Sequence, residues 1–235
     1  MALTAAQICT LARQIAKVPG FTSQSGQLLN MILSDLAQTY DFSNTRVTTN
    51  FNFNTALGSG PIPLPADYLR AEPGDVFYTI DGVKYILISI DLSEFDALVQ
   101  TAGLNNFPTY YTTDMSQSPP VMYVWMPPSG AYAVTIRYHS QPADITTPET
   151  SSAIPWFPNG TYLITRLAGE LCKITDDERW THLLGDGAQG AEGILRKYLM
   201  MEGDRETRAK TVKLDRRRFG GTLNNVPTTK LVGWP

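Results

Sequence analysis

The 235-residue sequence has few of the residues that usually carry catalysis or covalent cross-links. It contains two cysteines, Cys9 and Cys172, and two histidines, His139 and His182. Two cysteines so far apart indicate no disulfide framework. A zinc site would need all four residues to converge from separate elements, and their spacing gives no support for that. We interpret the cysteines as small core residues, His139 as lying on a solvated strand face and His182 on a helix flank.

Recognisable catalytic motifs are also missing, since the chain has no HExxH, no GxSxG and no paired CxxC. GDGAQG at residues 185–190 fits G-x-G-x-x-G, but the preceding RWTHLL is typical of a helix, whereas dinucleotide binding needs a strand there. Asp176-Asp177-Glu178 is better explained as a helix start, capped by Thr175 or Asp176, than as a cation site. We predict no enzymatic activity, no cofactor and no metal.

Long hydrophobic runs are absent as well. No stretch approaches eighteen uninterrupted apolar residues, which argues against a transmembrane helix, and the N-terminus lacks the pattern of a secretory signal. Apolar residues make up 43% of the chain and charged residues 17%, so a core can form. We expect a soluble protein made in a reducing cytoplasm, without a membrane partner.

The net charge of -3 is distributed unevenly along the chain. Residues 196–235 hold ten Lys or Arg and four Asp or Glu, a balance of +6, which leaves -9 for the rest. Such a basic end could bind nucleic acid or the acidic surface of another protein copy. Because the body is itself acidic, we favour the second interpretation.

Helical periodicity marks both ends of the chain. Residues 3–18 and 25–39 predict two short antiparallel helices, the first capped by Thr4 and stopped by Pro19-Gly20. The first helix is expected to bury one face, made of Leu3, Ile8, Leu11, Ile15 and Val18. Residues 160–174 predict a third helix, with Asn159 in its start sequence. Residues 176–203 predict a fourth, in which Gly185, Gly187, Gly190 and Gly193 either break the helix or let another backbone come close.

The middle of the chain has the alternation and turn signals of a sheet. RVTTNFNFNT from residue 46 predicts a strand, and VFYTI-DG-VKYILISI predicts a hairpin with a tight turn at Asp81-Gly82. A short helix follows at 91–102. VMYVWM and AYAVTIRYH, joined by a Pro-Pro-Ser-Gly turn, predict a second hairpin.

These patterns define an α+β fold, an antiparallel helical bundle with an inserted antiparallel β unit and an extended C-terminal arm. The expected parts are residues 1–45 (first part of the bundle), 46–150 (β unit), 151–204 (second part of the bundle) and 205–235 (basic arm).

Aromatic residues are frequent in the β unit, which leaves a sugar-binding or single-strand-binding surface open. Nucleic-acid stacking is disfavoured, because Lys84 is the one basic residue between 71 and 136. We interpret the rings mainly as sheet core with some interface contact. The alternative is a ligand-binding or hydrolytic β module, such as a carbohydrate-binding part of a tail component, that uses these tyrosines and carboxylates such as Asp114.

The C-terminal stretch TVKLDRRRFGGTLNNVPTTKLVGWP (211–235) combines basic and apolar residues without a helical or strand period. It is too apolar for a solubilising tail, and it is broken by glycine and proline. A segment of this kind orders by lying on a partner subunit. The residues expected to dock are Arg216, Arg217, Arg218, Phe219, Leu223, Val226, Leu231, Val232 and Trp234.

Several stretches of the chain resemble the head-to-tail adaptor (connector or head-completion) proteins of tailed, especially short-tailed, bacteriophages. They are LPADYLRAE at 64–72, DGVKYI, MYVWMPPSGAYAVTIRYHSQPADI, LITRLAGELCKITDDERW and the basic KLDRRRFGG. The glycine-rich GDGAQGAEG departs from the pattern, because the family usually keeps a regular helix there.

The resemblance implies a structural virion protein of the neck, made in the host bacterial cytoplasm. It implies a homo-oligomeric ring, commonly a dodecamer, between the portal protein and the tail or nozzle proteins, through which double-stranded DNA passes without sequence-specific binding. The arm would dock on the portal, on an adjacent adaptor or on both, and the four glycines would allow close packing between subunits. A different virion ring protein, such as a tail terminator, is a further alternative.

Overall fold

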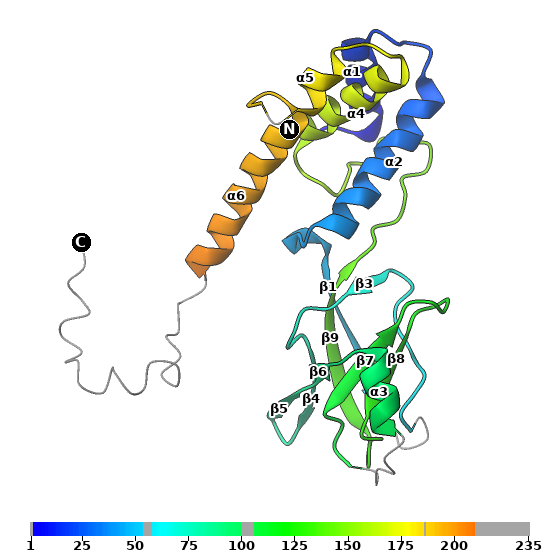
Figure 1. Ribbon diagram of the computed structural model, residues 1–235, viewed down its shortest axis with the longest axis vertical. Coiled ribbons are helices and arrows are strands. Elements are labelled where there is room, and N and C mark those ends of the chain that lie inside the picture. The colour runs from blue at the N-terminus through cyan, green and yellow to red at the C-terminus, as the bar shows by residue number, and fades with distance from the viewer. Residues whose placement is uncertain (1, 54–57, 100–105, 186, 210–235) are drawn as a thin grey trace, which may run out of the picture.

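The computed structural model describes residues 2–53, 58–99, 106–185 and 187–209, with side chains up to Glu202. It confirms a mixed α+β fold (Figure 1). Helices gather at one end of an elongated molecule and strands at the other, while the last described helix, α6 (Ala191–Ala209), runs down one flank. The residues from 210 onward, which the sequence assigns to the arm, lie outside the described part.

Helix α1 (Ala5–Ala16) begins as predicted, at Thr4. The Thr4 hydroxyl accepts a hydrogen bond from the Gln7 backbone N–H, and the Gln7 side chain accepts one from the Thr4 N–H, which forms a capping box. The predicted buried face is wrong in part, because Leu11 and Ile15 are 38% and 41% exposed. Small side chains decide the packing instead, since they let α1 approach helix α4 closely. The buried residues of α1 are Ala5, Ile8, Cys9, Ala12 and Ala16.

Helix α2 (Thr22–Thr39) starts three residues earlier than predicted, and α4 (Gly160–Ile174) matches its predicted range. The Asn159 side chain accepts a hydrogen bond from the Tyr162 N–H and so caps α4. Both helices contribute to one core with α1 and the start of α6. The largest fully buried members of this core are Ile8, Leu29, Leu36, Phe42, Phe157, Leu163 and Leu167.

The predicted fourth helix is broken at its glycines, into α5 (Trp180–Leu184) and α6 (Ala191–Ala209). The predicted caps are wrong, because Thr175 follows the end of α4 and Asp176 has a left-handed backbone with φ 55°. Asp177 accepts the Arg179 backbone N–H instead. Helix α6 continues to Ala209, so residues 205–209, which the sequence assigned to the arm, are helical.

Two sheets form the other end of the molecule. The first, here called the β9 sheet, has the order β1-β9-β4-β5, with β3 also paired to β9. The second, the β8 sheet, has the order β2-β8-β7-β6. The strands are β1 (Arg46–Phe53), β2 (Ile62–Pro63), β3 (Tyr68–Arg70), β4 (Val76–Ile80), β5 (Val83–Ile86), β6 (Ile88–Ser89), β7 (Tyr110–Asp114), β8 (Val121–Trp125) and β9 (Tyr132–Ser140).

The hairpin predicted at Asp81-Gly82 is confirmed, with φ values of 48° and 80°. The second predicted hairpin is wrong, because β8 pairs with β7 and β2 while β9 pairs with β1, β3 and β4. Both edges of β9 are already occupied, so the chain crosses between sheets at residues 126–131. The stretch expected to form one strand after Gly82 is also divided, and β6 joins the β8 sheet in parallel with β7. The β unit is therefore not purely antiparallel.

The sheets enclose a second core, separate from the helical one. It contains Val134, Ile136 and Tyr138 of β9, as the alternation predicts, together with Phe53 and Tyr78. Helix α3 (Leu92–Val99), which confirms the predicted short helix, packs on the β8 sheet through Phe95. The Trp125 ring N–H donates to the Leu98 carbonyl. Six of the fourteen aromatic residues between 46 and 150 are buried, so the expectation that these rings are mainly sheet core holds for fewer than half of them.

Polar contacts join the two ends of the molecule where α2 meets the strands. The Arg70 guanidinium donates to the Asp41 carboxylate at 2.6 Å and to the backbone carbonyls of Gln38 and Ala37. It therefore caps the carbonyl end of α2, where a cation is favourable. His139 was expected on a solvated face but is 3% exposed, because the short helix at 43–45 covers it. Its Nδ1 lies 3.0 Å from the Thr45 hydroxyl.

We expect Arg70→Ala to lower the free energy of unfolding by about 1 kcal/mol, the net value of a hydrogen-bonded group of this kind. It should also make the unfolding of the two ends less cooperative, since α2 loses its cap from β3. Urea titration followed by circular dichroism measures both effects. Arg137→Ala on the exposed face of β9 is the matched control, and an equal loss there would contradict the role of Arg70.

Candidate docking surfaces

The described residues contain no group of three or more His, Cys, Asp or Glu that could hold a metal ion. Cys9 and Cys172 are buried in the helical core, as the sequence predicted, and burial raises the pKa of both thiols. His139 lies at the junction with the strands, apart from this core. The described residues also expose several large apolar side chains, and the surfaces that these form are candidate docking sites for another protein.

The predicted close-packing glycines lie at the break between α5 and α6. A side-chain carbon at Gly190 would fall on the carbonyl oxygen of Gly185 and lie 3.0 Å from that of His182. Gly187 has open space around it, and Gly193 lies in the first turn of α6. Gly185 and Gly190 thus allow a close approach within the chain. Packing between subunits at these glycines stays a prediction.

A short hydrogen-bonded clasp holds the turn between α4 and α5 against the end of α1. The Arg179 guanidinium donates to both carboxylate oxygens of Asp177 and to the backbone carbonyls of Ile15 and Ala16. These hydrogen bonds lower the pKa of the Asp177 carboxyl to about 2. The clasp therefore fixes the start of α5, for which Arg179 is the N-cap, against the end of α1.

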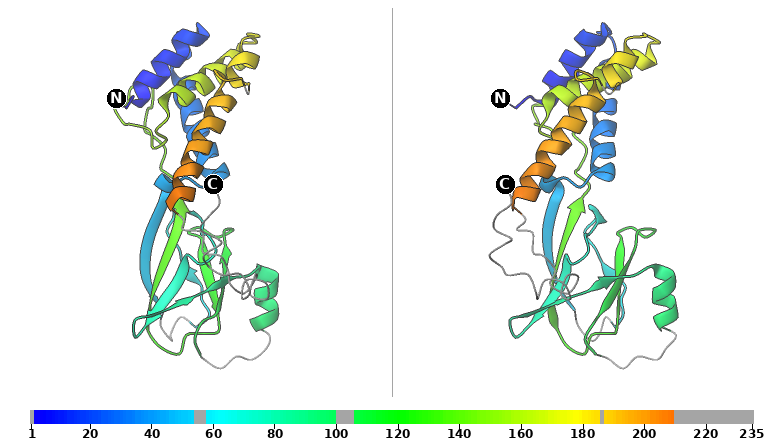
Figure 2. Two further views of the ribbon diagram at one scale, coloured as in Figure 1. Left: turned by 90° about the vertical axis from the view of Figure 1, so that its left-hand side faces the viewer. Right: turned by 60° about the vertical axis from the view of Figure 1, so that its left-hand side comes forward.

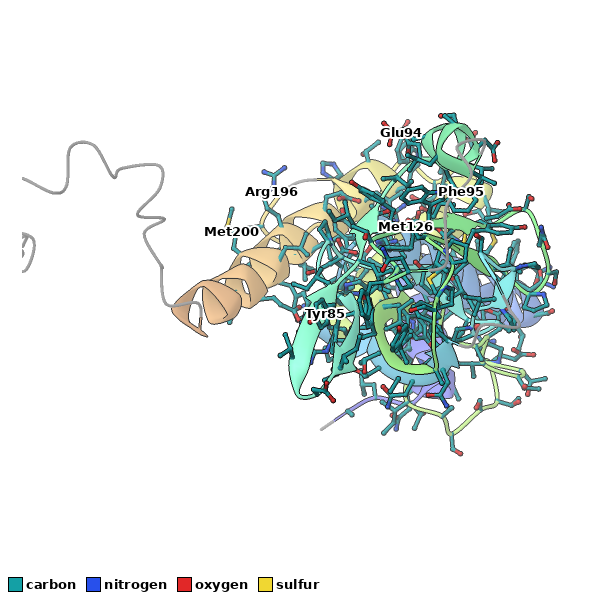
Figure 3. All side chains as sticks on the ribbon, turned by 90° about the horizontal axis from the view of Figure 1, so that it is seen from below. Tyr85, Glu94, Phe95, Met126, Arg196 and Met200 are labelled. Carbon is teal, nitrogen blue, oxygen red and sulfur yellow. The ribbon has the colours of Figure 1, made fainter. Side chains whose placement is uncertain are left out.

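Strand β5 is an exposed apolar edge of the β9 sheet. All four of its residues are exposed, and the following Ile88 is 53% exposed. The Tyr85 ring stacks between Tyr78 and Phe107 at 5.4 Å and 6.3 Å, and Figure 3 shows it at the outer side of the strand end. Lys84 lies over the Phe77 ring at 3.8 Å. An edge strand of this composition is a surface to which another strand can add.

A second apolar surface lies on the outer face of α1. Leu3, Ala6 and Leu11 line a shallow groove of about 400 Å³, and a neighbouring hollow continues past Arg13 and Lys17. Leu11 is one of the two residues that the helical pattern wrongly assigned to the core. The groove is basic at its far end.

Helix α6 carries the third surface, which was not among the predicted sites. Met200 and Met201 are 65% and 56% exposed, one turn after the exposed Arg196 and Lys197. Figure 3 shows Arg196 and Met200 pointing away from the body of the molecule. The adjacent methionines were a usable signal, because they interrupt the apolar spacing of the buried face. The predicted docking residues from Arg216 to Trp234 lie beyond the described residues.

Apolar faces exposed on a strand edge and on two helices mark a protein that works within an assembly. The chain belongs to the SU10 adaptor protein family, whose model matches residues 3–215. It is accordingly a head-to-tail adaptor of tailed bacteriophages, a component of the virion neck. No curated protein matches the chain. Among the helices described, none has both the length and the apolar character needed to cross a membrane.

Proposed function

We propose that the protein is a structural, non-enzymatic subunit of a ring, commonly of twelve copies, between the portal and the tail or nozzle proteins of a short-tailed phage. Membership of the adaptor family supports a place between head and tail. The elongated shape, with helices at one end and sheets at the other, gives each subunit two separate ends for two different neighbours (Figure 1). In this arrangement the helical ends form the wall of the ring as a bundle.

The proposed docking role rests on the direction in which α6 leaves the helical core and on the sequence that follows this helix. Helix α6 leaves the helical core and ends at Ala209 on one flank of the molecule (Figure 2). The next 26 residues, 210–235, include Arg216, Arg217 and Arg218 and the apolar Phe219 and Trp234. A basic and apolar segment thus follows directly on the end of α6, and we propose that it lies on the portal.

The acidic body suits a DNA passage. Residues 1–195 carry a balance of -9, which repels the phosphate backbone of passing double-stranded DNA. DNA therefore moves through the ring without sequence-specific binding. The carbohydrate-binding alternative loses part of its candidate surface, because Tyr78, Tyr111 and Tyr138 are buried, whereas Tyr85 is exposed.

A truncated chain that ends at Ala209 is expected to fold normally and to lose attachment to the portal ring. Co-sedimentation of full-length and truncated protein with the portal measures this directly. Attachment of the full chain should weaken as salt rises, because exposed charge pairs are screened. Circular dichroism of the truncated chain is the folding control. Retained attachment after truncation would overturn the docking role of residues 210–235.

A further inference from the structure

The outer face of α6 has no partner among the described residues that would cover it. Ala191 and Leu195 are buried in the helical core, so the first half of the helix is anchored. In the second half, the described contacts lie on the opposite side, where the Ser43 hydroxyl donates to Glu202 at 2.7 Å. At 100° per residue, Arg196, Lys197, Met200 and Met201 share one side of the helix. No ion pair joins Arg196 or Lys197 to another described side chain.

This exposed face is expected to be covered in the assembled state. Two adjacent methionines more than half exposed form a flexible apolar contact surface, and methionine adapts well to the shape of a partner. A helix of this length gains most of its stability from packing rather than from intrinsic propensity. The charges beside the methionines then decide which kind of surface can pack there.

A complementary groove lies on the opposite flank of the molecule, along α2. It has a volume of about 480 Å³, and Met31 within it is 65% exposed. Asp35 and Asp144 supply negative charge at its margin. Figures 1 and 2 place α2 and α6 on opposite sides of the helical end. The full lining is Gln27, Asn30, Met31, Ser34, Asp35, Gln38 and Asp144.

We propose that the outer face of α6 in one copy packs into the α2 groove of the next copy. Met200 and Met201 then contact Met31, while Arg196 and Lys197 face Asp35 and Asp144. Because the two surfaces differ and lie on opposite flanks, each copy uses both, and repetition of the contact builds a ring when the rotation between copies closes. This contact rests on the proposed ring function and names the subunit surfaces that build the ring.

Charge selects this groove over the apolar surfaces described above. The hollow along α1 is lined by Arg13 and Lys17, which repel the basic face of α6. Strand β5 carries Lys84. The α2 groove has two aspartates and no Lys or Arg in its lining. Opposite charges at its margin therefore favour α6 and fix its register.

A cysteine pair tests the contact in the full-length chain. In Met31→Cys/Met200→Cys, a short bismaleimide is expected to join successive copies into a ladder of dimers, trimers and larger species on a denaturing gel. Each single variant should remain a monomer, because identical positions do not meet. Met31→Cys/Met115→Cys is the matched control. It should give no ladder, because Met115 is exposed at the strand end of the molecule and has no place in the proposed contact. Wild type should not react, since Cys9 and Cys172 are buried.

Charge reversal provides the second measurement. Adding Arg196→Glu and Lys197→Glu to the cysteine pair is expected to reduce cross-linked species by about tenfold. Adding Asp35→Lys and Asp144→Lys as well should restore them, because the attraction is then reversed in sign but preserved. If neither charge reversal alters the amount of cross-linked ladder, the assigned register is overturned.

The same cross-linking is repeated on adaptor mixed with portal rings. This experiment distinguishes a failure of the α6–α2 contact from a failure of the proposed function. Binding to the portal without a ladder would overturn the α6–α2 contact and leave the adaptor role standing. A ladder without portal binding would support the contact and count against the portal partnership. Cross-links to the portal from the Met200→Cys single variant, in place of the ladder, would overturn the contact by showing that α6 docks on the portal instead.

Discussion

Phe157→Ala is expected to lower the free energy of unfolding by about 3–5 kcal/mol, the range for removal of a fully buried aromatic ring. Phe157 is 2% exposed and lies at the centre of an aromatic cluster. Its ring centroid is 5.0 Å from Tyr198, 5.3 Å from Phe42, 5.4 Å from Tyr162 and 5.8 Å from Trp156. The cluster joins the loop before α4 to three other elements, so one substitution weakens several contacts at once.

The loss should be felt most strongly at α6, because Tyr198 is the aromatic side chain that holds this helix to the cluster. Urea unfolding followed by circular dichroism measures the total effect, and hydrogen exchange locates it. Phe157→Leu keeps most of the buried volume and should lose less. Ile154→Ala, in the same loop but 62% exposed, should change stability by less than about 0.5 kcal/mol. A loss below about 1 kcal/mol for Phe157→Ala, far under the range for a buried ring, would contradict its central place.

Features with a local physical cause could be predicted from the sequence. The Thr4 capping box, the Asn159 cap of α4 and the tight turn at Asp81-Gly82 each depend on residues within four positions of one another. The break among the glycines after α5 belongs to the same class, since the cost of glycine in a helix is intrinsic. The sequence therefore predicted the starts of α1 and α4 and the hairpin at Asp81-Gly82 correctly.

Features that depend on residues far apart in the sequence could not be predicted in this way. The alternation in β8 and β9 predicts two strands but not their partners, and the short loop between them suggested a hairpin. Strands β1 and β4 take both edges of β9, and they lie more than 50 residues before it. Helix α1 shows the same limit, because its fit against α4 depends on the small Cys9 and Ala12 rather than on Leu11.

The candidate docking surfaces were predictable to different degrees. The arm residues from Arg216 to Trp234 follow from composition alone, and their docking stays a prediction. The α2 groove was not predictable, because Asp144 joins Asp35 only when the loop after β9 folds along α2. The Asn30 side chain holds that loop through two hydrogen bonds of 3.1 Å with the Ile145 backbone.

Gly190→Ala is expected to destabilise the chain by about 2–4 kcal/mol and to move α6 relative to the helical core. The added methyl group would meet the carbonyl oxygen of Gly185, and this is backbone that cannot rotate away as a side chain can. Overpacking of this kind costs about 1–3 kcal/mol, and alanine directly before a helix is less favourable than glycine by about 1 kcal/mol. Thermal unfolding of the free chain measures the loss.

Gly187→Ala is the matched control, because it lies in the same loop and has nothing within 4 Å of the added carbon. It should leave both stability and cross-linking unchanged. If Gly190→Ala weakens the α6–α2 cross-link while Gly187→Ala does not, the loop acts by orienting α6 toward the α2 groove of the next copy. If Gly187→Ala disrupts cross-linking without changing the stability of the free chain, the glycines pack directly between subunits, as the sequence first suggested. The two substitutions therefore decide whether this loop positions the ring contact or belongs to it.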